Sequence, residues 1–419
     1  MLSKLNSLME GRVSVFKNFL ALGILQGTNF LIPLIIMPYL VNTIGIERYG
    51  FISFAQVVMI YLFSLTDYGF AITATQEIAT NKSDVNKLSD VFSKVITVKG
   101  FLVFVSAIIL ALLLLFIPQI KADQLTFILG FMLVIGQTSL PTWFFQGIEK
   151  MKYITYVNLG AKLLFTAFIF LFVTEKDHYP FVLLFFGLGN LISGIIGTWY
   201  AVRKYNLKFK LASIAQVKLE LYKGWGLFVA NFSITSYMNS NLFILKFFTS
   251  DLVVGYYSVA EKIVMAVRQI LVVFSQAIFP HICQLAEESY SKVIHFFKQV
   301  FVPFTLFIVL VCGLTYIYSA EVIGIFAKDQ VSGINHLLRL LIVVPIIVCL
   351  NIFPSQILLS YNLRKGYTAV MILGSVLNVL LNITLASKFG AEGTAISVIV
   401  TEIFILVGLF FMSKKAELS

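Results

Sequence analysis

The sequence predicts an all-α polytopic membrane protein with about twelve transmembrane helices in two six-helix bundles related by a pseudo-two-fold axis. The first observation is composition, since 59% of the 419 residues are hydrophobic and only 12% are charged. A soluble fold of this composition would leave much apolar surface in water. The second is the recurrence of apolar runs of about 20 residues, long enough to cross a bilayer. The third is an uneven distribution of lysine and arginine among short loops, which indicates a fixed orientation.

The apolar runs define twelve predicted spans. A continuous helix is the expected structure of each, because it satisfies its own backbone hydrogen bonds in lipid. The first run follows a basic segment but exceeds the apolar core of a signal peptide and has no small-x-small cleavage site, so we expect an uncleaved span. The runs centre on residues 19–40, 51–72, 100–117, 125–145, 154–173, 181–201, 225–248, 252–280, 300–319, 337–360, 368–386 and 393–412.

The basic residues predict that both termini are cytoplasmic. With that orientation, the seven inner segments carry 21 of the 31 lysines and arginines, and the six outer loops carry 5. Such a bias over short loops follows the positive-inside rule. The remaining basic residues lie within or at the edges of spans: Lys162, Lys246, Lys262, Arg268 and Arg339.

Several other classes of function are disfavoured by the same residues. The formal charge of +11 is scattered and forms no basic stripe with interleaved aromatics, which argues against nucleic-acid binding. The three cysteines are far apart, so neither a disulfide nor a metal site is expected. Gly45–Gly50 has the glycine spacing of a phosphate-binding loop, but Phe51 replaces the required lysine. No cofactor is predicted, and the loops are too short to form catalytic domains.

An internal repeat at an offset of 205 residues supports two related halves. Gly50–Gln56 aligns with Gly255–Glu261, with glycine, serine and alanine identical at three positions. Six spans separate the copies, so both halves enter the membrane with the same polarity, as in parallel-repeat transporters with a site near the midplane. The predicted organisation is a bundle over 1–202, a basic cytoplasmic linker over 203–224 and a second bundle over 225–419.

Polar side chains inside the predicted spans are the candidate site residues, because intramembrane charges usually face a wet cavity or a partner. The richest stripe lies in the span 252–280 and follows helical spacing: Ser258, Glu261, Lys262, Met265, Arg268, Gln269, Ser275 and Gln276. Repeat-related spans add further polar residues: Asn231, Thr235, Asn239, Lys246, Ser53, Gln56, Asp67, Gln26 and Asn29. Together they predict an asymmetric cavity that is lined by positively charged side chains.

Each charged candidate also has a purely structural interpretation. Lys246, Lys262 and Arg339 lie near span ends and could extend to the headgroups. Arg268 lies about a dozen residues from either end of its span, so a cavity role is favoured, with a buried pair to Glu261 as the alternative. The two roles can coexist.

The remaining polar residues leave similar alternatives open. Lys162 shares a stripe with Thr155, Asn158 and Thr166 and is a weaker cavity candidate, as is Glu402. Asp67 could gate, pair, carry a proton or cap a helix end. The predicted role of three asparagines is to hydrogen-bond neighbouring helices: Asn351, Asn378 and Asn382.

A series of short motifs resembles Wzx-type polysaccharide flippases over nearly the whole chain. In the amino half they include Asn29–Pro33, Pro38–Leu40, Ile44–Gly50, Asp67–Phe70 and Thr75–Ala79. Further along they include Gln146–Gly147, Glu149–Met151 and Gly390–Gly393. Each motif is short, and the specificity lies in the series.

This resemblance implies a fold and a substrate. The fold would be two six-helix bundles forming a V around a central cavity, as in the superfamily that includes lipid II flippases and multidrug exporters. The substrate would be an undecaprenyl-pyrophosphate-linked oligosaccharide, such as an O-antigen repeat unit, turned from the inner to the outer leaflet of a bacterial cytoplasmic membrane. Expected partners are a polysaccharide polymerase and a chain-length regulator. Coupling to an ion gradient would give Asp67, Glu261 or Glu402 a titrating role.

Three other functions compete with this interpretation. A drug/ion antiporter of the same superfamily would favour an anionic cavity for amphipathic cations. A membrane glycan polymerase or ligase, which is an enzyme, would need a sizeable outer loop for its acceptor, and the predicted loops are short. A membrane scaffold would gain nothing from intramembrane charges. The sequence therefore favours a transporter that is not an enzyme.

Overall fold

The computed structural model describes residues 27, 31–328 and 331–417. Within these residues the chain is helical and contains no β-strand. Nine of the described helices are long and apolar enough to cross a membrane, and a shorter apolar helix covers Leu31–Ile44. The predicted fold class, an all-α multi-pass membrane protein, is confirmed.

The chain forms two compact units. The N-terminal unit contains the described residues up to Ile44 together with Ala55–Ser236, and the C-terminal unit contains Gly45–Phe54 and the described residues from Tyr237 onward. The division therefore falls inside two continuous helices, α2 (Ile46–Asp67) and α10 (Ile214–Phe248). The predicted linker, 203–224, includes the end of one helix and the start of α10, and its role as a linker stays a prediction.

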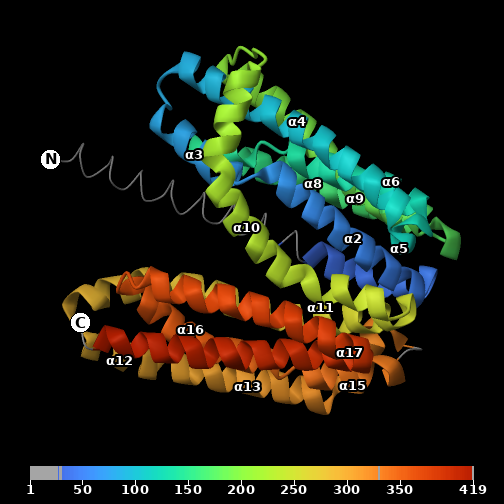
Figure 1. Cartoon of the computed structure of the whole chain (residues 1–419), viewed down its shortest axis with the longest axis vertical. Coiled ribbons are helices and arrows are strands. Elements are labelled where there is room, and N and C mark those ends of the chain that lie inside the picture. The colour runs from blue at the N-terminus through green and yellow to red at the C-terminus, as the bar shows by residue number, and fades with distance from the viewer. Residues whose placement is uncertain (1–26, 28–30, 329–330, 418–419) are drawn as a thin grey trace. The chain divides into compact units, whose positions relative to one another are not determined.

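The N-terminal unit is built from helices that pack along one another, as Figure 1 shows for α6, α8 and α9. Besides most of α2 and the first part of α10, its elements are α3 (Phe70–Thr80), α4 (Val85–Phe116), α5 (Pro118–Lys121), α6 (Gln124–Ser139), α7 (Thr142–Gly147), α8 (Met151–Phe172), a 3₁₀ turn (Lys176–His178) and α9 (Pro180–Tyr205). Aromatic and aliphatic side chains from α3, α4 and α7, including Ile78, Phe92 and Trp143, form a buried cluster in this unit.

The C-terminal unit is organised around α16, which packs against α11, α13 and α17. With the first turns of α2 and the end of α10, its elements are α11 (Asp251–Glu288), α12 (Tyr290–Phe296), a π-helical turn (Phe297–Phe301), α13 (Val302–Ile317), α14 (Ser319–Phe326), α15 (Val331–Leu341), α16 (Val344–Ser360) and α17 (Arg364–Glu417). The two halves of α17 correspond to two predicted spans, separated where Gly390 adopts a positive φ of 58° that breaks the helical path.

Capping side chains set where α4 and α6 begin, and in α4 the start lies well before the predicted apolar run. Asp84 caps α4 by accepting hydrogen bonds from the backbone of Asn86 and Lys87, at 3.0 and 3.2 Å. The helix therefore starts fifteen residues before the run at 100–117, with its polar first turns outside the apolar window. Asp123 caps α6 in the same way, accepting from the backbone of Thr126 at 3.2 Å.

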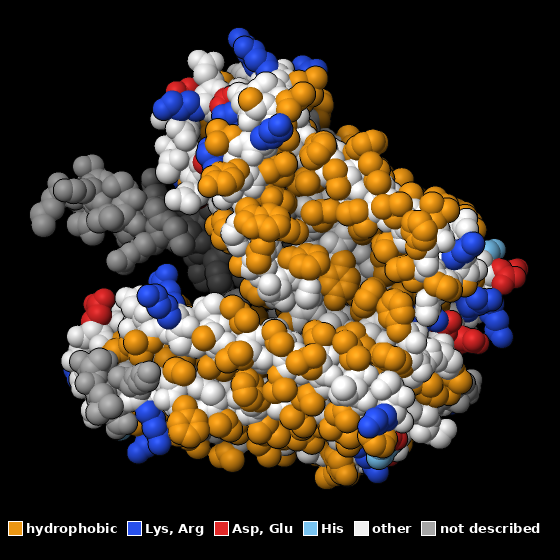
Figure 2. Space-filling model, viewed as in Figure 1, with side chains coloured by type: hydrophobic (Ala, Val, Ile, Leu, Met, Phe, Trp, Pro, Cys, Tyr) orange, Lys and Arg blue, Asp and Glu red, His pale blue; other side chains and the backbone are white. Residues whose placement is uncertain are grey.

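The exterior of each unit is apolar along the sides of its helices. Figure 2 shows hydrophobic side chains covering much of the visible surface, with lysines and arginines gathered mainly toward the helix ends. Large side chains such as Leu115 and Leu171 are each 66% exposed, which is the pattern expected where lipid is the solvent.

The repeat-related glycines meet where the first turns of α2 cross α11, inside the C-terminal unit. A Cβ added to Gly50 would lie 2.2 Å from the carbonyl oxygen of Asp251 and 2.5 Å from the backbone nitrogen of Gly255. Three residues further along each helix, Ser258 Oγ donates a hydrogen bond to Ser53 Oγ at 2.8 Å. Glycine spacing therefore permits a backbone approach that no larger residue allows.

We expect Gly50→Ala to lower the free energy of unfolding by about 1–3 kcal/mol, because the added methyl group would meet backbone atoms. Gly160→Ala is the matched control, since nothing lies within 4 Å of a Cβ added there. Alanine at that helical position should be neutral or stabilising by up to about 1 kcal/mol. Thermal unfolding of the two purified variants in detergent measures both effects, and equal stability of the variants would contradict the close crossing.

Candidate functional site

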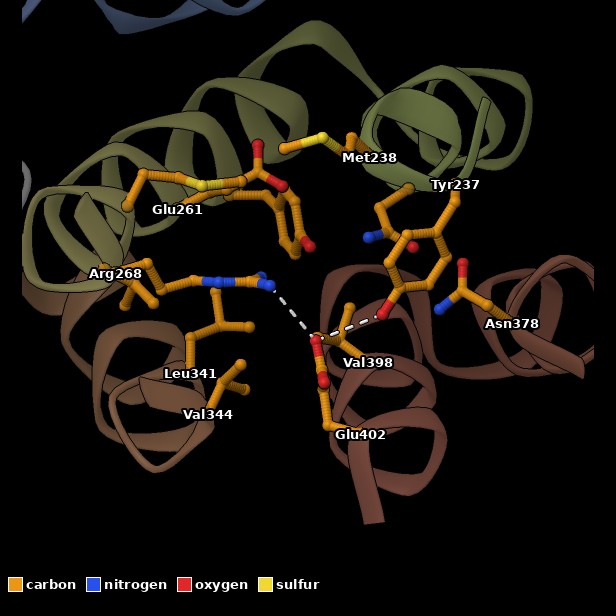
Figure 3. A pocket seen from close by; sticks show the side chains of 13 residues that line it. Tyr237, Met238, Glu261, Arg268, Leu341, Val344, Asn378, Val398 and Glu402 are labelled. Carbon is orange, nitrogen blue, oxygen red and sulfur yellow. Dashed lines mark hydrogen bonds and ion pairs between the residues drawn. The ribbon is translucent and has the colours of Figure 1, made fainter. Parts of the chain in front are cut away.

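A small polar pocket lies inside the C-terminal unit and is named the C-terminal pocket here. Its volume is about 40 Å³, enough for one or two water molecules. Figure 3 shows its side chains converging from α10, α11, α15, α16 and α17. They are Tyr237, Met238, Asn241, Tyr257, Glu261, Val264, Met265, Arg268, Leu341, Val344, Asn378, Val398 and Glu402.

The carboxylate of Glu402 is the centre of the hydrogen bonding in this pocket. Its Oε1 accepts from Arg268 Nη2 at 3.2 Å and from the Tyr237 hydroxyl at 3.1 Å. Its Oε2 accepts from Asn351 Nδ2 at 3.1 Å. Only 3% of Glu402 is exposed, so these three donors replace the water that an ionised carboxylate would otherwise require.

Arg268 pairs with Glu402, not with the Glu261 that the alternative interpretation proposed. The reason is helical geometry, because Glu261 and Arg268 lie seven residues apart on α11, about 10 Å along the axis. Both nevertheless line the same pocket. The structure thus brings together two carboxyl groups and one guanidinium group from two distant parts of the sequence.

The asparagines predicted to join helices do so, and these interpretations are confirmed. Asn351 of α16 reaches Glu402 of α17, and Asn378 Nδ2 donates to Thr401 Oγ1 across the two halves of α17 at 3.3 Å. Asn382 Nδ2 donates to Asn241 Oδ1 of α10 at 3.0 Å. Sequence reasoning did not identify Tyr237 or Asn241 as pocket residues, because an isolated tyrosine or asparagine gives no sign of its partner.

Lys246 and Lys262 do not line the C-terminal pocket and lie next to the first turns of α2. Lys246 Nζ is 2.5 Å from Asp251 Oδ1, and Lys262 Nζ donates to the Tyr49 hydroxyl at 2.6 Å. Their ammonium groups also lie over the rings of Phe51 and Tyr49, at 5.7 and 4.7 Å from the centroids. The predicted place of both lysines in a substrate cavity stays a prediction.

A second and larger cavity, the N-terminal pocket, lies within the N-terminal unit. Its volume is about 330 Å³, and it contains two predicted cavity residues, Gln56 of α2 and Lys162 of α8. The other lining residues are Ile32, Pro33, Phe63, Leu133, Gln137, Leu140, Thr142, Asn158, Phe165, Thr166, Phe185, Phe186, Gly189 and Asn190.

Asp67, the last residue of α2, forms an ion pair with Lys99 of α4, with Oδ1 and Nζ 3.3 Å apart. Of the roles considered for Asp67, pairing is the one found in the structure. Lys99 precedes the predicted apolar run at 100–117 by one residue, yet it lies within α4 and is only 4% exposed. This buried pair was missed because hydropathy alone does not reveal where a helix starts.

The other predicted cavity residues are not gathered at either pocket. Asn231 and Asn239 lie on α10 but are not among the residues that line the two pockets. Gln26 and Asn29 lie outside the described residues. Within the described part of the chain, no group of three or more histidine, cysteine, aspartate or glutamate side chains is placed to bind a metal ion.

The apolar helices of membrane length define a multi-pass membrane protein, and comparisons with known proteins place the chain more closely. The family model described as "Polysaccharide biosynthesis protein" matches residues 15–286. The chain therefore belongs to this polysaccharide biosynthesis protein family.

Similar sequences and structures extend over almost the whole chain. It is 27% identical over 412 residues to a protein of Escherichia coli strain K12 named "Putative O-antigen transporter", covering 96% of this chain and 98% of the relative. A protein of the same name from Shigella dysenteriae is also 27% identical, over 96% of this chain and all of the relative.

Solved structures of 12 to 15% identity share the fold. An inward-facing multidrug resistance MATE family transporter of the MOP superfamily gives a TM-score of 0.70, with 96% of this chain and 98% of that one covered. The lipid II flippase MurJ gives 0.60, over 88% and 85%. The predicted family resemblance is confirmed by the family model and the two relatives, and the solved structures show the shared fold.

We expect Glu402→Gln to destabilise the chain by about 1–3 kcal/mol, because it removes the buried carboxylate of a part-buried ion pair and leaves the donor groups around it poorly satisfied. Glu288→Gln is the control, since Glu288, the last residue of α11, and Lys292 of α12 form an exposed pair, and such pairs contribute little to stability. Combining Glu402→Gln with Arg268→Met in a double-mutant cycle measures the coupling between the two side chains by thermal unfolding. Strictly additive effects would contradict the pairing.

Proposed function

We propose that this chain is a flippase that moves an undecaprenyl-pyrophosphate-linked oligosaccharide, such as an O-antigen repeat unit, from the inner to the outer leaflet of the bacterial cytoplasmic membrane by alternating access. Family membership supports this proposal, as do the names of the two relatives and the fold shared with a lipid II flippase. Both termini are proposed to be cytoplasmic, as the distribution of basic residues among the loops favours.

The physical problem in such a reaction is the polar head of the lipid. A pyrophosphate bearing sugars cannot enter hydrocarbon without losing its hydration, whereas a polyprenyl tail can remain in lipid throughout. A protein that moves the head needs polar and cationic side chains at membrane depth, where they are costly to keep. The C-terminal pocket and a larger pocket in the N-terminal unit each contain polar and cationic side chains, on helices of membrane length.

The observation that carries the proposal is Arg268, a guanidinium deep in α11 that is held by Glu402. Although Glu402 is almost fully buried, the Arg268 side chain keeps 25% of its surface exposed and lines a pocket, so it remains accessible to a ligand. The guanidinium group of arginine carries several N–H donors in one plane, and two of them can bind two oxygens of the same phosphate. Arg268 is therefore the proposed counter-charge for the pyrophosphate when the pocket opens, and its exchange between Glu402 and the substrate is the proposed step.

Coupling to an ion gradient is assigned to the acidic residues of the C-terminal pocket. Glu261 and Glu402 lie beside Arg268 in a volume suited to a proton or a small cation rather than to a sugar. A cation bound at Glu402 would neutralise the carboxylate and release Arg268. Asp67 is a further proposed coupling or gating residue, through its pair with Lys99.

A drug/ion antiporter is the second candidate function, favoured by the two carboxylates of the C-terminal pocket and by the MATE-like fold. The lining of the N-terminal pocket argues against it, because its one ionisable side chain among the described residues is Lys162, which repels cations. Expression of the chain in a drug-sensitive strain distinguishes the two, since a flippase should not raise resistance to amphipathic cations.

A polymerase and a chain-length regulator are the proposed partners that act on the exported glycan.

We expect Arg268→Ala to abolish display of the glycan in a strain deleted for its own copy of this gene, and Arg268→Lys to retain part of it because a cation remains. Immunoblots of surface glycan measure the outcome, and immunoblots of the membrane fraction confirm that each variant is present. Lys292→Ala, which alters an exposed pair, should complement fully. Full complementation by Arg268→Ala would refute the assignment of this arginine.

Glu261→Gln tests the proposed coupling separately. We expect it to remove the dependence of flipping on an imposed ion gradient in proteoliposomes, because the side chain can no longer gain or lose a proton or hold a cation. Glu287→Gln, on α11 outside the pocket lining, serves as the matched control and should keep the gradient dependence. Gradient dependence that persists in Glu261→Gln would contradict its coupling role.

A further inference from the structure

The N-terminal pocket is much larger than the C-terminal pocket, and this difference in volume limits which ligand each pocket can hold. At about 330 Å³, it reaches the lower end of the ~300–1,000 Å³ typical of small-molecule sites. It would accommodate about ten water molecules at ~30 Å³ each, or one ring-sized polar group in their place. A whole oligosaccharide is too large, and the C-terminal pocket is too small for any sugar.

Two buried polar atoms in this cavity lack partners. Asn158 Oδ1 and Thr166 Oγ1 have no hydrogen bond to another described residue, although both atoms are shielded from bulk solvent. Asn158 is only 1% exposed, and it shares a helical stripe on α8 with Lys162 and Thr166 at four-residue spacing. Buried polar atoms are normally bonded, so orphaned ones that line a cavity indicate that water or a ligand supplies the bonds.

The charge of the lining restricts the ligand further. Lys162 is the single ionisable side chain among the described lining residues, and none of these is acidic. The amides of Gln56, Gln137 and Asn190 add groups that can both donate and accept, as neighbouring sugar hydroxyls require. A cationic ligand is disfavoured, and a ligand with one negative charge is matched.

The aromatic walls separate a sugar from a pyrophosphate. Phe63, Phe165, Phe185 and Phe186 contribute apolar surface to the pocket. Such rings suit the C–H face of a pyranose, which is apolar, while the ring edge carries the hydroxyls. A pyrophosphate would place more than one negative charge among phenylalanines with a single lysine, and the desolvation of the unmatched charge would be costly.

We propose that the N-terminal pocket binds one carboxylate-bearing sugar ring of the translocated glycan, of the uronic-acid type. Lys162 faces the carboxylate, Asn158 and Thr166 bond ring hydroxyls, and the phenylalanines cover the apolar face. This inference rests on the proposed function and adds a sugar-selecting site that is separate from Arg268.

Binding of three monosaccharides to the full chain in detergent tests the site directly. The probes are glucuronic acid, glucose and glucosamine, which differ in charge, and saturation-transfer NMR gives their relative affinities. A charge-assisted hydrogen bond exceeds a neutral one by roughly tenfold in affinity, so glucuronic acid should bind about tenfold more tightly than glucose, and glucosamine more weakly than both. Equal affinities for the three, or a preference for glucosamine, would overturn the proposal.

Variants assign the selectivity to named side chains. Lys162→Met keeps the side-chain length and should reduce the preference for glucuronic acid over glucose to about one. Thr166→Val is nearly isosteric. It should lower the affinities for glucuronic acid and glucose about equally and leave the ratio of the two affinities unchanged, so it reports on the pocket even if Lys162→Met fails to fold. Lys292→Met, an exposed site, is the control and should change nothing. An unaltered ratio in folded Lys162→Met, or unaltered affinities in Thr166→Val, would overturn the proposal.

Glycan export separates this inference from the function on which it rests. If the wild-type chain exports no glycan, the proposed function fails. If it exports, Lys162→Met should lose export of a glycan that contains an acidic sugar far more than export of a neutral one. Equal export of both by this variant would overturn the sugar site and leave the flippase proposal intact.

Discussion

The constraint on which this structure depends is that a charge placed at membrane depth must find its compensation within the protein. Glu402 shows how completely this is met, because a guanidinium, a phenol and an amide from three other helices converge on one carboxylate. Lys99 and Asp67 repeat the solution in the other unit with a single pair. Since lipid tails offer no hydrogen bonds, these contacts fix how the helices pack, and they also provide the polar interior that the proposed function requires.

The two pockets differ in charge and size, and the difference suits them to different ligands. The C-terminal pocket is small, with two carboxylates and one guanidinium, which suits an ion and a switching arginine. The N-terminal pocket is larger and basic, with amides and phenylalanines that suit a sugar. In the proposed mechanism, energy coupling and glycan selection are therefore assigned to different units of one chain.

Much of the fold could be predicted from the sequence, because twenty-residue apolar runs leave few structures other than membrane helices. Helix starts were harder to predict, as Lys99 shows, because a capped polar turn such as that at Asp84 lies outside any apolar window. Glu261 and Arg268 were identified from their spacing on one helix. The Arg268–Glu402 pair was not, since residues 134 positions apart are joined only by tertiary packing, which a single sequence does not encode in any readable period.

The most direct test of the central claim is a flipping assay with the purified chain in liposomes that contain a fluorescent undecaprenyl-pyrophosphate-linked sugar. A membrane-impermeant quencher added outside reaches only lipid in the outer leaflet. If the chain moves the charged lipid, fluorescence should fall further, and faster, than in protein-free vesicles, until nearly all of the labelled lipid has been exposed. Quenching that stops at the outer-leaflet fraction, with folded protein present and with or without an ion gradient, would contradict the account.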